Sequence, residues 1–158
     1  EIEAIRTLES KSSVLYLGLD LARFDSCPAE RREGLPALIL WNHRWEYDKN
    51  PQDFFAAMKI IKEKGLDFRL NVIGEQFRDQ PEVFNWAKGY FADHIDRWGY
   101  QPSRDKYETA LAESDIVVST ANHEFFGLTV MEAIAAGLYP LLPDRLSYPE
   151  LLKDIPNT

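Results

Sequence analysis

The sequence predicts an α/β fold, a Rossmann-like doubly wound sheet of parallel strands. After residue 36, five short apolar runs alternate with five helical patterns. The runs are continuously apolar, as expected of strands covered by helices on both faces. Glycines and an Asn-Pro pair separate the segments. We expect the default strand order of such a sheet, 3-2-1-4-5.

Residues 1–36 are predicted to be an interdomain lead-in outside the core. Residues 1–12 are polar and read as a helix, 14–17 are a short apolar run, and 23–36 read as an exposed connector. The nucleotide-sugar-binding domain is then expected over 37–158. Because the chain starts at Glu1 and not at Met, we expect it to be an excised piece of a longer protein.

Turn and capping residues place the elements of this domain. Asn50 is the expected N-cap of the first helix with Pro51 at its first position, Ser103 caps a later one, and Gly65 and Gly137 end helices. The expected strands cover 37–41, 68–73, 95–98, 116–119 and 138–142. The expected helices cover 51–64, 80–90, the segment after Ser103, 126–136 and 147–153.

Composition excludes several kinds of protein. The net charge of −8 makes the domain a poor long-range partner for nucleic acid. No apolar run approaches the ~20 residues of a membrane span, so no membrane partner is expected. One cysteine and three scattered histidines predict no metal site, and the single Cys27 fits a reducing cytoplasm.

Polar residues follow every predicted strand, at the edge where such sheets bind ligands. Arg44 offers a fork of donors and Lys49 a point charge, while the helix start near Phe126 offers free N–H groups. Gly127 allows close backbone approach. This edge is therefore predicted to bind a diphosphate.

Two glutamates lie eight residues apart on the helix after the fourth strand. Glu124 is placed to accept sugar hydroxyls, and Glu132, a costly charge on an apolar helix, to accept those of a ribose. Alternatively, Glu124 stabilises the helix dipole and Glu132 pairs with a core tyrosine or an arginine.

Other candidates also have simpler interpretations. Arg44 and Lys49 taken alone are typical surface charges, and His43 and His123 are typical packing or capping residues. Aromatic packing accounts for Trp41, Trp45, Phe125 and Phe126. The convergence of the polar candidates on one sheet edge favours a ligand site.

The motif Glu-Phe-Phe-Gly-Leu-Thr-Val-Met-Glu-Ala at 124–133 resembles the glutamate–seven residues–glutamate motif of glycosyltransferase family 4. The segments at 18–24 and 42–51 resemble other parts of that group. The resemblance implies half of a two-domain GT-B fold, with the acceptor-binding domain absent. Residues 39–46, 48–51, 74–77, 98–100 and 119–127 are also similar to the tRNA-queuosine mannosyltransferases. His43 stands where the wider group has glycine, which fits this narrower family.

This resemblance implies a retaining transfer from GDP-mannose to queuosine in tRNA-Asp, without a protein nucleophile, metal or further cofactor. Arg44, Lys49 and Glu124 would be catalytic. The implied donor-binding residues are Asn42, His43, Gly74, Gly99, Tyr100, His123, Phe125, Phe126, Gly127, Leu128, Thr129 and Glu132. The tRNA would be held mainly by other parts of the enzyme.

Two alternatives stay open: another UDP- or GDP-linked sugar transferred to a lipid or polysaccharide, and a non-catalytic nucleotide-binding module. A dehydrogenase is disfavoured because no Gly-x-Gly-x-x-Gly follows the first strand.

Overall fold

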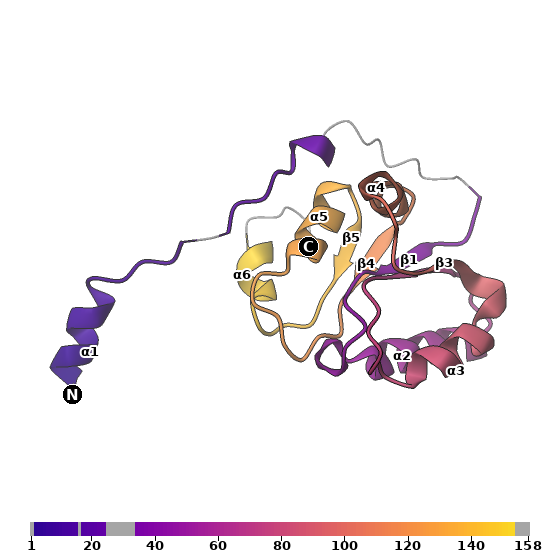
Figure 1. The fold of residues 1–158 in the computed structure, drawn as a ribbon, viewed down its shortest axis with the longest axis horizontal. Helices are drawn as coiled ribbons and strands as arrows, with labels where there is room; N and C mark the ends of the chain where they lie inside the picture. Colours follow the sequence, from indigo (N-terminus) through magenta and orange to yellow (C-terminus); the bar gives the residue numbers. More distant parts are fainter. Residues whose placement is uncertain (1, 16, 25–33, 154–158) are drawn as a thin grey trace.

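The computed structural model describes residues 2–15, 17–24 and 34–153 (Figure 1). Its centre is a five-stranded sheet of order β3-β2-β1-β4-β5, in which all neighbouring strands are parallel. The strands are β1 (Leu38–Trp41), β2 (Arg69–Ile73), β3 (Ile95–Gly99), β4 (Ile116–Val118) and β5 (Tyr139–Leu141). The predicted fold class and strand order are both confirmed.

Helices cover both faces of the sheet (Figure 1). One face carries α2 (Pro51–Glu63) and α3 (Val83–Tyr90), and the other carries α4 (Arg104–Ala112) and α5 (Leu128–Ala135). The short elements are η1 (Ala22–Phe24), η2 (Tyr47–Lys49), η3 (Ala92–His94) and α6 (Tyr148–Leu152). This layering leaves the carboxyl ends of the strands open at one edge.

The two faces bury different cores. Beneath α2 and α3 the core is aromatic, and Trp45 stacks on Phe84 with 3.9 Å between ring centroids. Trp41 and Trp45 are buried, as predicted. Beneath α4 and α5 the core is aliphatic and includes Leu111 and Val117. The two cores fix the strands whose ends carry the site.

The lead-in is not wholly outside the core, so that prediction is wrong at one position. Phe24 is 3% exposed and packs in the aliphatic core. By contrast, α1 (Ile2–Glu9) has no buried residue and stands apart from the domain in Figure 1. Residues 25–33, most of the predicted connector with Cys27, lie outside the described residues.

Of the predicted helix starts, the cap at Ser103 is confirmed, whereas Asn50 and the start at residue 126 differ from the prediction. The Ser103 hydroxyl accepts the Lys106 N–H, as expected of a cap. Asn50 precedes α2 but has φ of 50°, and its side chain bonds Asp53 instead of a backbone N–H. The helix expected from residue 126 begins at Leu128.

None of the helices in the described part of the chain has the length and apolar character of a membrane span.

Candidate functional site

Two cavities adjoin at the carboxyl edge of the sheet. The first, of about 440 Å³, is here called the Tyr100 cavity. The second, of about 400 Å³, is called the Lys49 cavity. The residues that line both are His43, Arg44 and Thr129. These three form a wall common to the two cavities.

The structure brings nearly all predicted site residues to these cavities. The Tyr100 cavity holds the predicted residues Asn42, His43, Arg44, Gly74, Tyr100, Thr129 and Glu132. The Lys49 cavity holds His43, Arg44, Lys49, His123, Glu124, Phe125, Phe126, Leu128 and Thr129. Gly99 and Gly127 line neither cavity among the described residues, although Gly127 donates its N–H to Glu124.

Lys49 is held inside the Lys49 cavity by three oxygens. Its side chain is 9% exposed, and its Nζ donates to the His123 carbonyl at 2.6 Å and to Glu124 Oε2 at 3.3 Å. Asp48 lies 3.3 Å away. The interpretation of Lys49 as an ordinary surface charge is therefore wrong. The interpretation as a surface charge fits Arg44 better, because the Arg44 side chain is 54% exposed and pairs with Glu46 at 2.9 Å.

Glu124 accepts three N–H groups of the loop that leads into α5. Its Oε1 receives those of Phe125, Phe126 and Gly127 at 3.0, 3.3 and 3.0 Å. Desolvation works to raise the pKa of Glu124, but the Gly127 N–H and the Lys49 ammonium outweigh it and the pKa is lowered. The alternative role of Glu124 on the helix dipole stays a prediction, because these N–H groups precede Leu128, the first residue of α5. The N–H groups expected to face a phosphate are occupied by this carboxylate.

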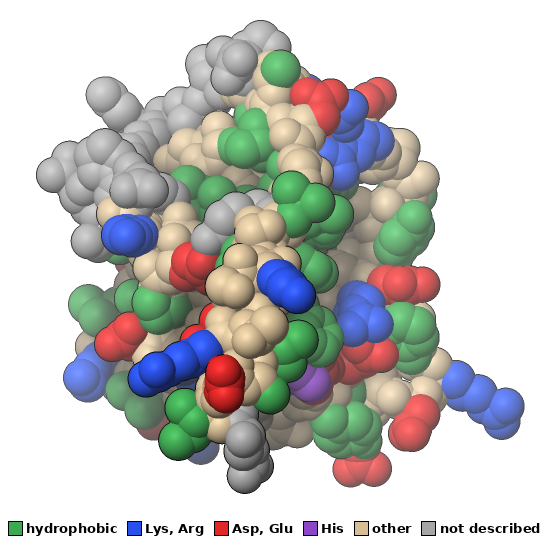
Figure 2. Space-filling view, turned by 90° about the vertical axis from the view of Figure 1, so that its left-hand side faces the viewer, with side chains coloured by type: hydrophobic (Ala, Val, Ile, Leu, Met, Phe, Trp, Pro, Cys, Tyr) green, Lys and Arg blue, Asp and Glu red, His purple; other side chains and the backbone are tan. Residues whose placement is uncertain are grey.

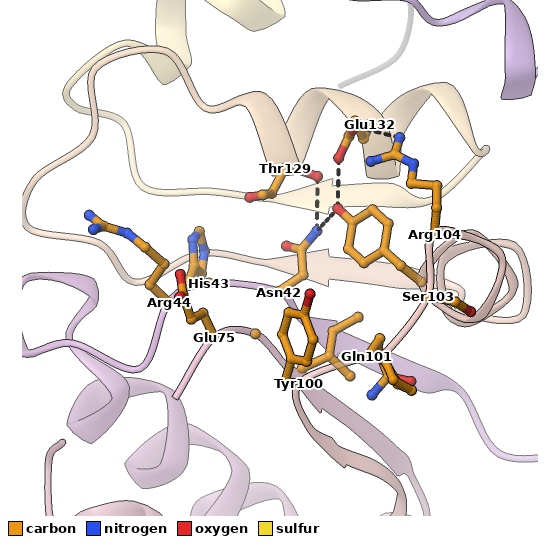
Figure 3. A pocket seen from close by; sticks show the side chains of 14 residues that line it. Asn42, His43, Arg44, Glu75, Tyr100, Gln101, Ser103, Arg104, Thr129 and Glu132 are labelled. Atoms are coloured by element: carbon orange, nitrogen blue, oxygen red, sulfur yellow. Dashed lines mark hydrogen bonds and ion pairs between the residues drawn. The ribbon is translucent and has the colours of Figure 1, made fainter. Parts of the chain in front are cut away.

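Glu132 is paired with a tyrosine and an arginine, which confirms the alternative drawn from the sequence. Its Oε2 accepts the Tyr107 hydroxyl at 2.8 Å, and its Oε1 accepts Arg104 at 2.7 Å. Asn42 joins this network through Tyr107 and the Thr129 carbonyl, at 3.4 and 2.9 Å (Figure 3). Burial and then Glu132 raise the pKa of Tyr107, which therefore stays a donor.

Arg104 and Tyr107 are site residues that were not predicted from the sequence. Both line the Tyr100 cavity, and they lie three residues apart on α4. Such spacing places two side chains on one helix face. In Figure 3, Arg104 and Glu132 lie at one end of the cavity, and His43 and Arg44 at the other. The signal in the sequence that could have identified these two residues is the start of a helix directly after a strand end.

The backbone of β1 and β2 meets closely beside His43. A Cβ added to Gly74 would lie 1.8 Å from the His43 carbonyl oxygen, so only glycine fits there. His43 is 3% exposed, and its Nε2 has no hydrogen-bond partner in the described part of the chain. The capping role considered for His43 is therefore not observed.

The aromatic pair after Glu124 is exposed, which does not favour the simpler interpretation of these rings as packing residues. Phe125 is 73% and Phe126 50% exposed. The ring of Phe125 contacts that of His123 at 4.8 Å. Both phenylalanines line the mouth of the Lys49 cavity and are available to a ligand.

Comparison with known proteins gives consistent relatives. The chain is 34% identical over 151 residues to tRNA-queuosine alpha-mannosyltransferase of Drosophila melanogaster, covering 91% of this chain and 40% of the relative. It is 28% identical to a glycogen synthase of Mycobacterium tuberculosis, covering 85% and 32%. The chain thus spans less than half the length of these relatives.

A solved structure supports the fold. The crystal structure of the C-terminal domain of a glycosyl transferase group 1 family protein from Francisella tularensis aligns with a TM-score of 0.66 at 24% identity. The alignment covers 85% of this chain and 74% of that one. The predicted Rossmann-like domain of GT-B type is confirmed at the level of fold. Residues 28–156 match the family described as glycosyl transferases group 1, and the chain belongs to that family.

Proposed function

We propose that this domain binds the donor of a retaining mannosyltransferase, GDP-mannose, across both cavities. The nucleoside would lie in the Tyr100 cavity and the hexose in the Lys49 cavity. The diphosphate would cross the wall they share, near Arg44 and Lys49. The observation that carries the proposal is this shared wall between two ligand-sized cavities, which contains Arg44, together with Lys49 in the adjoining Lys49 cavity.

The charges suit the chemistry of sugar transfer. As the glycosidic bond to the donor breaks, negative charge grows on the leaving diphosphate, and fixed cations stabilise that charge. Lys49 is held in place by three oxygens before any ligand arrives, so little reorganisation is needed. Arg44, more exposed, can leave Glu46 and close over the diphosphate. The proposed reaction uses no metal or further cofactor for this task.

Mannose as the sugar and queuosine in tRNA-Asp as the acceptor are supported by the 34% identical relative and by the motifs shared with that group. Such an acceptor would place the reaction in the cytoplasm. The tRNA would be held mainly outside this domain, whose net charge is −8. On the face in Figure 2, Lys and Arg side chains are scattered and form no continuous basic patch.

A second candidate is a domain that binds UDP-glucose or a similar donor for a polysaccharide acceptor. The similarity to a glycogen synthase favours it. The two candidates differ in the base that the Tyr100 cavity accepts. The proposed contacts of Arg44 and Lys49 with the diphosphate are the same in both.

Calorimetric titration of the chain with GDP-mannose, GDP, UDP-glucose and UDP tests the proposal. We expect GDP compounds to bind at least about tenfold more tightly, a difference of about 1.4 kcal/mol. Tighter binding of the UDP compounds would select the second candidate. Absence of binding by all four would contradict both candidates, and equal binding of free GDP and GDP-mannose would favour a non-catalytic nucleotide-binding module.

A further inference from the structure

The imidazole of His43 occupies an unusual position in the wall between the two cavities. It is almost fully buried, yet Nε2 has no partner in the described part of the chain. The ring packs edge-on against Trp41, with centroids 5.0 Å apart. A buried polar atom without a partner costs about 1–3 kcal/mol, which calls for an explanation.

Position in both cavities distinguishes His43 from other buried groups that lack partners among the described residues, since Asn42, whose Oδ1 is also unpartnered, lines the Tyr100 cavity alone. The indole nitrogens of Trp41 and Trp45 are also unpartnered, but neither tryptophan lines a cavity at this edge. His43 lines both cavities. A ligand that spans the two cavities must therefore pass this imidazole.

Burial, more than the surrounding charges, keeps His43 neutral at neutral pH. Burial lowers its pKa to about 4, and Lys49 adds to this effect, whereas Glu124 and Asp48 oppose it. Arg44 directly follows His43 in the chain and lines the same wall. The carboxylates of Glu75, beyond β2, and Glu132, on α5, line the Tyr100 cavity with it.

We propose that His43 contacts the diphosphate of the bound nucleotide-sugar and takes up a proton from solvent when that diphosphate arrives. This inference rests on the proposed function. The ligand brings two negative charges next to the ring, which lies beside Lys49 and Arg44, and these negative charges favour the imidazolium. The charged ring then joins Lys49 and Arg44 in stabilising the leaving diphosphate. His43 would thus be a third cation that exists only in the complex.

GDP-mannose is a clean probe because its diphosphate is esterified at both ends and does not titrate near neutrality. The chain is titrated at about pH 6 in two buffers of different ionisation enthalpy, which measures protons taken up on binding. We expect uptake of roughly 0.3–1 proton per ligand at about pH 6 and almost none at about pH 8. Guanosine, which lacks the diphosphate, should bind without proton uptake.

Two variants test whether His43 is the group that takes up the proton. His43→Gln keeps a hydrogen-bonding side chain that cannot titrate, and it should bind GDP-mannose with no proton uptake. His94→Gln is the matched control, because His94 bonds the Phe68 carbonyl at the other end of the sheet; it should behave as the native chain. Imidazole ¹⁵N shifts of the native chain report the charge of His43 directly, should His43→Gln fail to fold.

The outcomes separate the two proposals. GDP-mannose binding without proton uptake, or uptake that persists in His43→Gln, overturns the inference and leaves the proposed function standing. Failure of the native chain to bind GDP-mannose overturns both. Uptake lost in His43→Gln and kept in His94→Gln supports both.

Discussion

The two glutamates of the motif are both satisfied without ligand, but by different kinds of group. Glu124 is held by three backbone N–H groups and Lys49. Glu132 is held by two side chains of α4, Tyr107 and Arg104. The first arrangement positions the loop before α5 and a cation inside a cavity, and the second joins α4 to α5. We therefore expect changes in the Lys49 cavity to affect ligand binding, and changes in the Glu132 network to affect the free energy of unfolding in addition to binding.

The largest expected effect tests the binding half of this comparison. Lys49→Met keeps the length of the side chain and removes its charge. A charge-assisted contact to a diphosphate contributes about 2–4 kcal/mol, so GDP-mannose affinity should fall roughly 30- to 1000-fold. Calorimetry measures it. The control is Lys59→Met on α2, where Lys59 pairs with Glu63 at the surface and should not matter. Native affinity in Lys49→Met would remove Lys49 from the site.

The next effect tests the stability half. Tyr107→Phe removes the hydroxyl that donates to Glu132. Hydrogen bonds to charged groups contribute about 1.5–3 kcal/mol, so the free energy of unfolding should fall by about 2 kcal/mol in urea denaturation. Arg104→Ala should cost under about 1 kcal/mol, because the Arg104 side chain is 44% exposed and water weakens its ion pair. If Arg104→Ala were the more damaging variant, the network would be held by charge and not by the hydroxyl.

A pH effect of similar size follows from His43. Its folded pKa lies below the ordinary value, so the unfolded chain binds the proton first as pH falls. Stability should be flat above about pH 6.5 and fall by roughly 3 kcal/mol between about pH 6.5 and 4. Glu124, whose pKa is lowered, contributes stability lost only below about pH 4.5, so the two windows separate. Urea denaturation of His43→Gln should show a shallower loss; an unchanged slope would contradict this account.

The smallest effect separates sugar from phosphate. Glu124→Ala removes a hydroxyl acceptor but frees three N–H groups for an anion. GDP should therefore keep its affinity or gain some, while the advantage of GDP-mannose over GDP should shrink about tenfold. Both ligands are titrated by calorimetry. Equal losses for the two ligands would mean that Glu124 serves only the helix start.

Much of the fold could be predicted because the apolar runs and the turn residues agree. The position of Phe24 could not, since a single aromatic residue in a polar segment carries no periodicity. The partners of Glu132 could be anticipated as residue types but not as Arg104 and Tyr107. Their pairing depends on how α4 is rotated against α5, which packing alone decides. The exposure of Phe125 and Phe126 likewise depends on the path of the loop before α5.

The central claim is that one ligand spans both cavities. Backbone amide NMR of the ¹⁵N-labelled chain tests it most directly. GDP-mannose should shift the amides of Tyr100 and Gln101 in one cavity together with those of Phe126 and Leu128 in the other. Guanosine should shift only the first pair. Shifts confined to one cavity with GDP-mannose, or spread away from this edge of the sheet, would contradict the account.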